Sequence, residues 1–510
     1  MDPLMTLVDS VDARTGARIA TVHRESTADD IARATAAATA AFPWLIQLGR
    51  VGRAELLEDL ARALDDRADQ IVELADRETA LGEARLRFEL ARTTYQLRFM
   101  GQVAVEGSYL DASLETAGDT PAGPRPDLRR TSLPLGPVAV FGASNFPLAF
   151  SAPGGDTASA LASGCPVIVK AHSSHAGTSA AVAEAFREVL SDWDAPTGVF
   201  QLVFGRSAGV ALVNDPLIAA VGFTGSLAGG RALFDAVSRR PSPVPFYGEL
   251  GSVNPLVVTE AASRARPLEI GSGIAASMTQ GNGQFCTKPG LFLIPAGNSG
   301  DEVVGALVAA LQAVGEQFLL NDGILESFKE GTGTLRDLPE VEILHQGPTD
   351  ERRVGPLLVA ARPEDLSGTH GDALTEEYFG PFGVVVRYKS FAELRHVLEL
   401  LPPALTGTLH STGVDDPDIV SVAGLLAKRS GRLVFDQYPT GVSVSWGMHH
   451  GGTYPAATST GTSVGSNAIK RWLRPITYQN APATVLPSEL QDAGIAGFPR
   501  RVDGVLDLGR

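Results

Sequence analysis

Residues 137–142 read PVAVFG, a short apolar run that ends in glycine and predicts a buried β-strand. Three similar runs follow it along the chain: PVIVK at 166–170, VFQLVF at 199–204 and AAVGFT at 219–224. Helix-forming stretches alternate with these runs, at residues 173–190, 208–213 and 226–239. Strands and helices that alternate at this spacing predict right-handed βαβ units and a mostly parallel sheet, so the fold class is α/β.

Polar residues and glycines follow each of the four strands. Parallel sheets bind ligands beyond the carboxyl ends of their strands, so these residues predict the position of a site. They are Ala143-Ser144-Asn145, Lys170-Ala171-His172-Ser173, Gly205-Arg206-Ser207 and Gly225-Ser226.

The segments that precede this run of alternating strands and helices have a different pattern of hydrophobic residues. Helical periodicity predicts an all-helical start of about 100 residues, with helices over 27–41, 51–80 and 84–100 and Thr27 as an N-cap. Three prolines and two glycines in residues 116–130 indicate a loop or an excursion.

A second α/β block is predicted from about residue 254 to 469. Its strands include NPLVV, LFLI, GVVVRY and GRLVF, separated by helical stretches such as residues 301–320. The segment IKRWLRPITYQNAP, residues 469–482, is expected to be extended, and the tail after it is expected to be loop-like.

The composition limits which binding partners and which cellular compartment are expected for the protein. The 510-residue chain has a formal net charge of −16 and no Lys/Arg-rich run, which argues against nucleic acid and anionic membranes. Its two cysteines give neither a disulfide framework nor a zinc-binding pattern. No secretory signal and no membrane-spanning apolar run are visible, so we expect a cytoplasmic protein.

Glycines and amides lead up to Cys286 in the stretch QGNGQFCTKPG, residues 280–290. Glycine allows the backbone to approach a ligand closely, and N–H groups near a thiol stabilise an anion that forms at its target carbon. Cys286 is therefore a candidate nucleophile. The alternative is a free cysteine packed as a small hydrophobe, which is the role expected for Cys165.

Two further residues have the chemistry to assist a nucleophile. Glu249, between aromatic residues and glycines in FYGELGS, is a candidate general base with a raised pKa, or alternatively a surface salt-bridge partner. Asn145, in GASNFP, offers an amide that donates to an oxyanion or caps the next helix.

Two weaker signals complete the candidates. FTGSLAGGR, residues 223–231, is a glycine-rich strand-to-helix turn that suits a phosphate, although its spacing is not GxGxxG and such turns are often only tight turns. His449 and His450 are adjacent and expected to point apart, and no third ligand is suitably spaced, so no metal is expected.

Read together and in order, these motifs resemble the aldehyde dehydrogenase superfamily over nearly the whole chain; they are GASNFP, VIVKAHSSH, FTGSLAGGR, ELGSVNP, GQFCTKPG and EEYFGPFG. The resemblance implies two doubly wound α/β domains, a small β oligomerisation arm, and a homodimer or homotetramer. It assigns residues 1–115 and 136–251 to a dinucleotide-binding domain and 252–465 to a catalytic domain. Residues 116–135 and 466–510 form the arm and the C-terminal tail.

The resemblance also implies the catalytic roles. Cys286 adds to the aldehyde carbon, and the Asn145 amide and the Cys286 N–H hold the oxyanion. Hydride leaves to the nicotinamide, and Glu249 activates the water that hydrolyses the thioester. The implied cofactor-binding residues are Lys170 at the adenine ribose, Gly225, Ser226 and Gly230 in the pyrophosphate turn, Glu377 at the nicotinamide ribose and Phe379 near the nicotinamide.

Residues 146–179 and 439–458 resemble one branch of this family, and the resemblance implies that the loop with His449 and His450 lines the mouth of the substrate site. The branch contains bacterial α-ketoglutaric semialdehyde (2,5-dioxopentanoate) dehydrogenases and an NADP-dependent fatty aldehyde dehydrogenase. Two positions depart from the wider family: Ser144 stands where most members have tryptophan, and Gly154 where many have lysine. The expected reaction is oxidation of α-ketoglutaric semialdehyde. The alternatives are a medium- or long-chain aldehyde dehydrogenase, and a CoA-acylating or non-catalytic relative.

We expect NADP to be accepted at least as well as NAD, with dual use as the alternative. NAD-preferring members carry an acidic residue three positions after the adenine-ribose lysine, and here that position holds Ser173. Ser173 can donate to a phosphate, and Arg206 can close a basic pocket around it. Alternatively, Ser173 is a helix N-cap and Arg206 an exposed turn residue.

Overall fold

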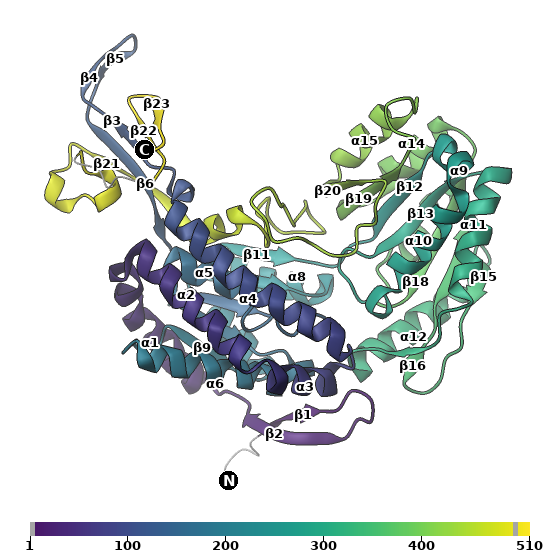
Figure 1. Cartoon of the computed structure of the whole chain (residues 1–510), viewed down its shortest axis with the longest axis horizontal. Coiled ribbons are helices and arrows are strands. Elements are labelled where there is room, and N and C mark those ends of the chain that lie inside the picture. The colour runs from purple at the N-terminus through teal and green to yellow at the C-terminus, as the bar shows by residue number, and fades with distance from the viewer. Residues whose placement is uncertain (1–5, 493–497, 510) are drawn as a thin grey trace.

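The computed structural model describes residues 6–492 and 498–509. It contains two large sheets, each covered by helices, and a smaller sheet that projects from the body (Figure 1). This arrangement confirms the predicted α/β class.

The first large sheet is parallel and has the order β11-β10-β7-β8-β9. Its strands are β7 (Val138–Phe141), β8 (Val167–Lys170), β9 (Phe200–Val203), β10 (Ala220–Thr224) and β11 (Phe246–Glu249). The helices that connect or follow them are α5 (Gly155–Ser163), α6 (Ala176–Asp192), α7 (Arg206–Asn214) and α8 (Leu227–Ser238). All four predicted strands are therefore present. From the central strand β7, the chain adds β8 and β9 on one side of the sheet and then β10 and β11 on the other side.

The N-terminal segment differs from the all-helical prediction. A β-hairpin, β1 (Leu7–Val11) and β2 (Arg18–Arg24), precedes the helices. Its second strand reads RIATVHR, in which β-branched residues and alternation favour a strand. The helices follow as α1 (Ala28–Gln47), α2 (Gly49–Asp66), α3 (Ala68–Thr79) and α4 (Glu83–Glu106). Thr27 is the predicted N-cap of α1, in a capping box with Asp30.

The second large sheet has seven strands, in the order β15-β17-β18-β13-β12-β19-β20. They are β12 (Asn254–Val258), β13 (Pro289–Pro295), β15 (Glu342–Gln346), β17 (Leu357–Ala361), β18 (Phe382–Tyr388), β19 (Ala404–His410) and β20 (Ser430–Phe435). Only β15, at one edge, is antiparallel to its neighbour among these pairings. Every residue of β12 and β13 is buried, as expected for strands covered on both faces.

Helices and two short strands surround this sheet. The helices are α9 (Glu260–Ala265), α10 (Pro267–Thr279), α11 (Asn298–Leu311), α12 (Asp322–Arg336), α13 (Gly371–Leu374), α14 (Phe391–Leu400) and α15 (Ile419–Ala427). The helix predicted over 301–320 ends earlier, at Leu311, and β14 (Gln317–Phe318) then pairs with β16 (Arg353–Val354).

The projecting sheet joins the Pro-rich excursion to the C-terminal segment. Its order is β21-β6-β3-β22-β23, built from β3 (Ser113–Glu115), β6 (Leu128–Pro134), β21 (Leu473–Gln479), β22 (Arg500–Val502) and β23 (Val505–Asp507). A separate hairpin, β4 (Gly118–Thr120) and β5 (Gly123–Arg125), forms its tip. The tail predicted to be loop-like therefore contributes two strands.

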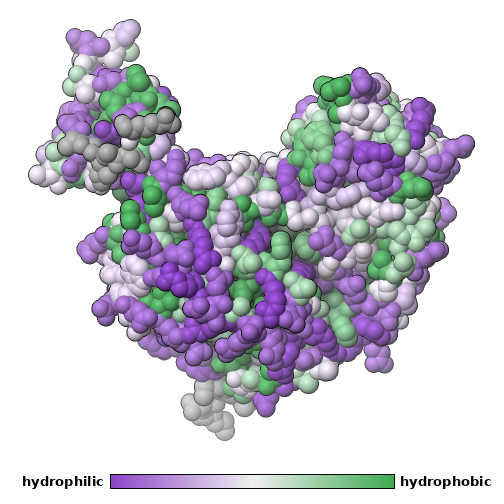
Figure 2. All heavy atoms as spheres, viewed as in Figure 1, coloured by the Kyte–Doolittle hydropathy of each residue, from purple (hydrophilic) through white to green (hydrophobic). Residues whose placement is uncertain are grey.

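Hydrophobic side chains remain exposed on this projection (Figure 2). Val505, Leu506 and Leu508 are 69%, 55% and 49% exposed, at and just after β23. Within residues 6–492 and 498–509, no helix is both long and apolar enough to cross a membrane.

Candidate active site

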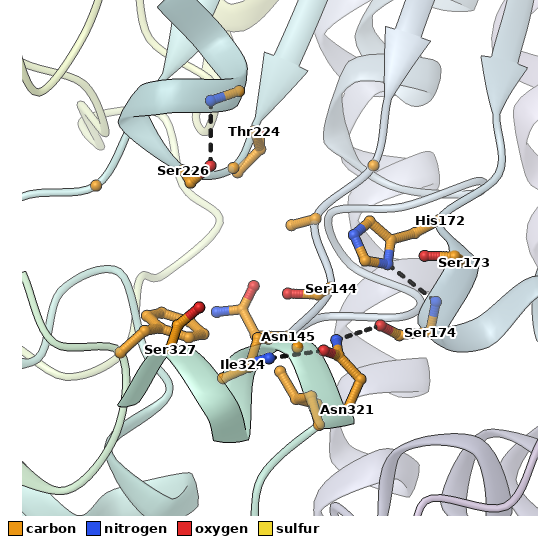
Figure 3. A pocket seen from close by; sticks show the side chains of 18 of the residues that line it. Ser144, Asn145, His172, Ser173, Ser174, Thr224, Ser226, Asn321, Ile324 and Ser327 are labelled. Atoms are coloured by element: carbon orange, nitrogen blue, oxygen red, sulfur yellow. Dashed lines mark hydrogen bonds between the residues drawn. The ribbon is translucent and has the colours of Figure 1, made fainter. Parts of the chain in front are cut away.

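A cavity of about 1100 Å³ lies at the carboxyl ends of the first sheet's strands, where they face the second α/β block. This volume is slightly above the range of roughly 300–1,000 Å³ that is usual for small-molecule and cofactor sites. Figure 3 shows Ser226 and Thr224 on one side of the view and Asn321 and Ser174 on another. The predicted residues that line the cavity are Asn145, Lys170, Ser173, Arg206, Gly225, Ser226, Glu249, Cys286, Glu377 and Phe379.

The loop before Cys286 has an uncommon backbone conformation. Gly281, Asn282 and Gly283 are consecutive left-handed residues, with φ of +56°, +53° and +68°. Gly283 has no room for a side chain, because a Cβ there would lie 2.1 Å from the carbonyl oxygen of Gly380. The Asn282 amide donates to the carbonyl oxygen of Gln317 at 3.1 Å. This conformation brings Cys286 to the cavity wall, as the glycine pattern predicts.

A fully buried amide, Asn254, holds the backbone at Cys286. Its Nδ2 donates to the carbonyl oxygens of Cys286 and Lys288, both at 2.9 Å. Its Oδ1 accepts from the Thr406 N–H at 2.9 Å and the Ser252 hydroxyl at 3.0 Å. Asn254 therefore ties the nucleophile loop to β12 and β19. The sequence gives it only as the first residue of a strand, so this role was missed.

The Cys286 thiol lies beside two titratable side chains. Its Sγ is 3.7 Å from Nε2 of His450, and the same nitrogen is 2.7 Å from Oε1 of Glu249. One ligand atom from each of these three residues lies within 4.8 Å of the others. The argument that His450 has no suitably placed companions is therefore wrong. Because a carboxylate only accepts, Nε2 carries the hydrogen that faces Glu249, so His450 orients this carboxylate and does not take the proton of the thiol.

Glu249 ends β11 and is only 6% exposed, which rules out the surface salt-bridge alternative. Its carboxylate accepts a hydrogen bond from the Ser463 hydroxyl. Burial raises the pKa of Glu249, but His450, Ser463 and Arg471 together oppose burial more strongly, so the net pKa is lowered. The predicted raised pKa is wrong, because these three residues come from a part of the chain about 200 residues away.

The pKa of the Cys286 thiol is shifted in the opposite direction, upward. Burial raises its pKa well above the ordinary value, and the carboxylates of Glu249 and Glu377 raise it further. Arg432 and the Thr287 N–H oppose this increase only in part. In this state Cys286 is a neutral thiol, so its activation needs a proton acceptor.

Two donors face the position next to the thiol. The Asn145 Nδ2 donates to the Gln284 carbonyl oxygen at 2.8 Å, and the second hydrogen of this amide remains for another acceptor. Arg85 donates to the Asn145 carbonyl oxygen at 2.7 Å and so fixes its backbone. The Cys286 N–H donates to no acceptor in the part of the chain that the structure describes. The alternative of Asn145 as a helix cap is not supported, because α5 begins after Gly154.

Basic and hydroxyl groups gather at the opposite part of the cavity, at the ends of β8 and β9. Burial lowers the pKa of Lys170, Glu25 opposes this, and Arg206 lowers it further. Ser173 is exposed, and the N-cap of the short helix after β8 is His172, whose Nδ1 accepts from the Ser174 N–H at 3.1 Å. Ser173 therefore keeps its hydroxyl available to the cavity, contrary to the N-cap alternative.

In the glycine turn before α8, the residues that face the cavity differ in part from those predicted. Gly225 and Gly229 line the cavity, and Ser226 caps the helix by accepting from the Gly229 N–H. Gly230 is absent from the lining and is buried; a Cβ there would lie 2.1 Å from Leu250 Cδ2. Gly230 therefore allows close packing of α8, and Gly229 takes the position facing the cavity.

Glu377 and Phe379 line the same cavity as the thiol and this turn. A Cβ at Gly251 would be 1.9 Å from Oε2 of Glu377, so that carboxylate packs directly on the backbone. Burial raises the pKa of Glu377 to about 7, while Lys288 and the Ser252 N–H oppose it. Burial lowers the pKa of Lys288 to about 8, and Glu377 opposes that shift. Lys288 was also missed by sequence reasoning, although it stands two residues after the thiol.

A direct contact joins the two α/β blocks across the cavity. The Asn321 side chain donates to the Ser174 hydroxyl at 2.7 Å and accepts from the Ile324 N–H, capping α12 (Figure 3). Asparagine before a helix signals an N-cap, but nothing in the sequence indicates its second contact.

Comparison with known proteins agrees with this geometry. The model of the aldehyde dehydrogenase family matches residues 3–323. The chain is 39% identical over 504 residues to an α-ketoglutaric semialdehyde dehydrogenase of Acinetobacter baylyi, covering 98% of this chain and 95% of the relative. It is 43% identical over 485 residues to α-ketoglutaric semialdehyde dehydrogenase 2 of Azospirillum brasilense, covering 93% and 91%.

A solved structure of similar fold is that of PnpE in complex with nicotinamide adenine dinucleotide. Its TM-score is 0.79 at 22% identity, and the match covers 93% of this chain and 95% of that one.

Proposed function

The chain belongs to the aldehyde dehydrogenase family, an NAD(P)-dependent family that oxidises aldehydes, and from this premise we propose how its own residues perform the reaction. The observation that carries the proposal is the contact of Cys286 with His450 and Glu249, next to two free N–H donors. In the first step, the thiol gives up its proton to a water molecule in the cavity as Sγ bonds to the aldehyde carbon, while the His450 Nε2–H holds the Glu249 carboxylate in place. The carbonyl electron pair moves to oxygen, where Asn145 and the Cys286 N–H stabilise it.

The residues lining the cavity fit a nicotinamide dinucleotide. The Lys170 amine has no carboxylate within 4.0 Å among the described residues, and the N-terminus of α8 faces the cavity through Gly225 and Ser226. Lys170 would bind the adenine ribose, the turn the pyrophosphate, and Glu377 and Phe379 the nicotinamide end. When bound, this cofactor supplies the hydride acceptor.

The aldehyde carbon, having lost its hydride, remains bound to Sγ as a thioester. Glu249 then takes a proton from a water molecule, whose oxygen attacks the thioester and releases the acid and the thiol. The lowered pKa of Glu249 keeps it ionised and able to accept that proton. A glutamate in this place is what a hydrolytic enzyme needs and a CoA-acylating one can lack.

The proposed substrate is α-ketoglutaric semialdehyde, oxidised to α-ketoglutarate. Support comes from the two relatives of that name at 39% and 43% identity. We expect the semialdehyde to have the highest kcat/KM in a panel that includes hexanal, decanal and succinic semialdehyde, with no acyl-CoA formed when CoA is added. Higher kcat/KM for hexanal or decanal would overturn this choice in favour of an aliphatic aldehyde.

We also propose that NADP is accepted at least as well as NAD. The support is the exposed Ser173 hydroxyl beside Lys170 and Arg206 on the cavity wall. Ser173→Glu adds a carboxylate that repels a 2′-phosphate, so we expect the NADP/NAD ratio of kcat/KM to fall at least tenfold, about 1.4 kcal/mol. Ser173→Gln is the control of similar size without charge. A wild-type preference for NAD of tenfold or more, or an unchanged ratio in Ser173→Glu, would contradict the proposal.

The division into domains remains part of this proposal. The projecting sheet of β3, β6 and β21–β23 is proposed as an oligomerisation arm, supported by the exposed apolar side chains at β23. Because β3 belongs to the arm, the first boundary moves from residue 115 to residue 112: residues 1–112 and 136–251 then form the cofactor domain, and residues 252–465 the catalytic domain.

A further inference from the structure

Two arginines near the Cys286 thiol have no acidic partner. Arg92 and Arg432 are both partly buried, and neither lies within 4.0 Å of a carboxylate of residues 6–492 or 498–509. Most other arginines of α4 are paired, for example Arg98 with Glu58 and Asp65. Removing a guanidinium partly from water without a counter-ion costs folding free energy. A function for the two arginines would explain why this cost is tolerated.

Arg92 makes only long hydrogen bonds. Its Nε and Nη2 are each 3.4 Å from the Val442 carbonyl oxygen, and Nη1 is 3.3 Å from Oε1 of Gln96. Such distances exceed the usual range for charged donors. The nearby carboxylate of Glu89 accepts from the N–H groups of Leu148 and Ala149 through Oε1, and its Oε2 lies 4.0 Å from Arg85 rather than within that distance of Arg92. The donors of Arg92 are therefore weakly satisfied.

Arg432, on β20, is held more firmly, and its charge is not neutralised by a carboxylate of the described residues. Its Nη1 donates to the Gly441 carbonyl oxygen at 2.9 Å, and Nη2 donates to the Pro439 carbonyl oxygen. Its Nε is buried without any hydrogen-bond partner. This nitrogen is enclosed by protein atoms, so Arg432 acts on a bound anion through its charge rather than through a hydrogen bond from Nε.

Both arginines approach the thiol through short chains of contacts. The guanidinium of Arg92 lies 5.1 Å from the centre of the Phe150 ring, which packs edge-on against His450. Arg432 holds the segment 439–441, whose Gly441 N–H donates to Oγ1 of Thr287 at 3.3 Å, next to Cys286. Burial lowers the pKa of both guanidinium groups; the Glu89 carboxylate is the strongest opposing charge for Arg92, and the negative form of the thiol opposes the shift for each arginine. The positive charges of Arg92 and Arg432 therefore both interact with the thiolate form of Cys286.

We propose that Arg92 and Arg432 form a carboxylate-binding subsite that holds the far end of a short, acid-bearing aldehyde while its carbonyl carbon meets Cys286. This inference rests on the proposed function and specifies how the substrate is selected. In α-ketoglutaric semialdehyde the carboxylate is four carbon–carbon bonds from the aldehyde carbon, roughly 5 Å. Arg92 is the principal ligand because its donors are the least satisfied, and Arg432 adds its positive charge. An aliphatic aldehyde would leave both charges uncompensated.

The test compares a charged and a neutral aldehyde of equal chain length in single variants. We expect Arg92→Gln to raise KM for α-ketoglutaric semialdehyde at least tenfold and to change KM for pentanal by no more than threefold. Arg432→Gln is expected to act in the same direction with a smaller effect, and Arg92→Lys to restore part of the loss. Arg98→Gln, on the same helix and paired to carboxylates, is the matched control and should leave both KM values unchanged.

Pentanal turnover shows that each variant is folded, so a parallel loss with both aldehydes would mean a structural role and overturn the subsite. Unchanged KM values in Arg92→Gln would overturn it as well. Succinic semialdehyde separates this inference from the choice of substrate. If the wild type prefers that aldehyde and Arg92→Gln removes the preference, the subsite stands while the proposed substrate fails.

Discussion

Replacing Cys286 with alanine is expected to abolish aldehyde oxidation and to leave dinucleotide binding intact. Alanine cannot form the covalent bond to the aldehyde carbon, and the proposed cofactor contacts at Lys170 and Gly225 do not involve the thiol. Steady-state NADPH formation should fall below detection, while fluorescence titration with NADPH should give an unchanged Kd.

The second cysteine supplies the matched control. Cys165 is completely buried, and its Sγ lies 3.5 Å from the Trp472 carbonyl oxygen, far from the cavity lining. Cys165→Ala should keep wild-type turnover. More than a trace of activity in Cys286→Ala would remove Cys286 from the role of nucleophile, as would loss of activity in Cys165→Ala alone.

Glu249→Gln is expected to slow thioester hydrolysis much more than thioester formation. Glutamine keeps the size of the side chain but cannot accept the proton of water. Rapid mixing with excess aldehyde should give a burst of NADPH close to one equivalent per active subunit, followed by a steady state at least a hundredfold slower than wild type. Absence of the burst would instead place Glu249 in thiol activation.

The same variant has a second readout at Cys286. The Glu249 carboxylate contributes to the raised pKa of this thiol, so its removal should lower that pKa. The pH profile of iodoacetamide alkylation, measured without cofactor, should therefore move to lower pH in Glu249→Gln. A profile that stays in place would show that the carboxylate is not coupled to the thiol.

Local signals predicted the parts of the site that are local in sequence. The glycines before Cys286 specify a backbone conformation, and the hydroxyls, glycines and lysine after β8 and β10 lie at the carboxyl edge of a parallel sheet. Neither inference depends on a distant segment. The N-terminal hairpin was missed for a related reason, since its short alternating strand was outweighed by the long helical pattern that follows it.

Contacts between distant segments could not be read in this way. His450 is 164 residues from Cys286, and its loop has no regular period that would fix its direction. The pKa of Glu249 was misjudged because its frame of glycine and aromatic residues indicates burial, whereas the charges that offset burial come from His450 and Arg471. Arg92 likewise looks like any helix arginine until the 439–442 segment is placed against it.

Asn254 has a consequence for the entropy of catalysis. Its single amide fixes the carbonyl groups on both sides of Thr287 and links them to two buried strands, so the nucleophile's backbone is ordered in the protein without any ligand. The conformational freedom of Cys286 is then lost during folding, within the cooperative ordering of the second sheet. Substrate binding need not supply that ordering, and more of its free energy remains for orienting the aldehyde.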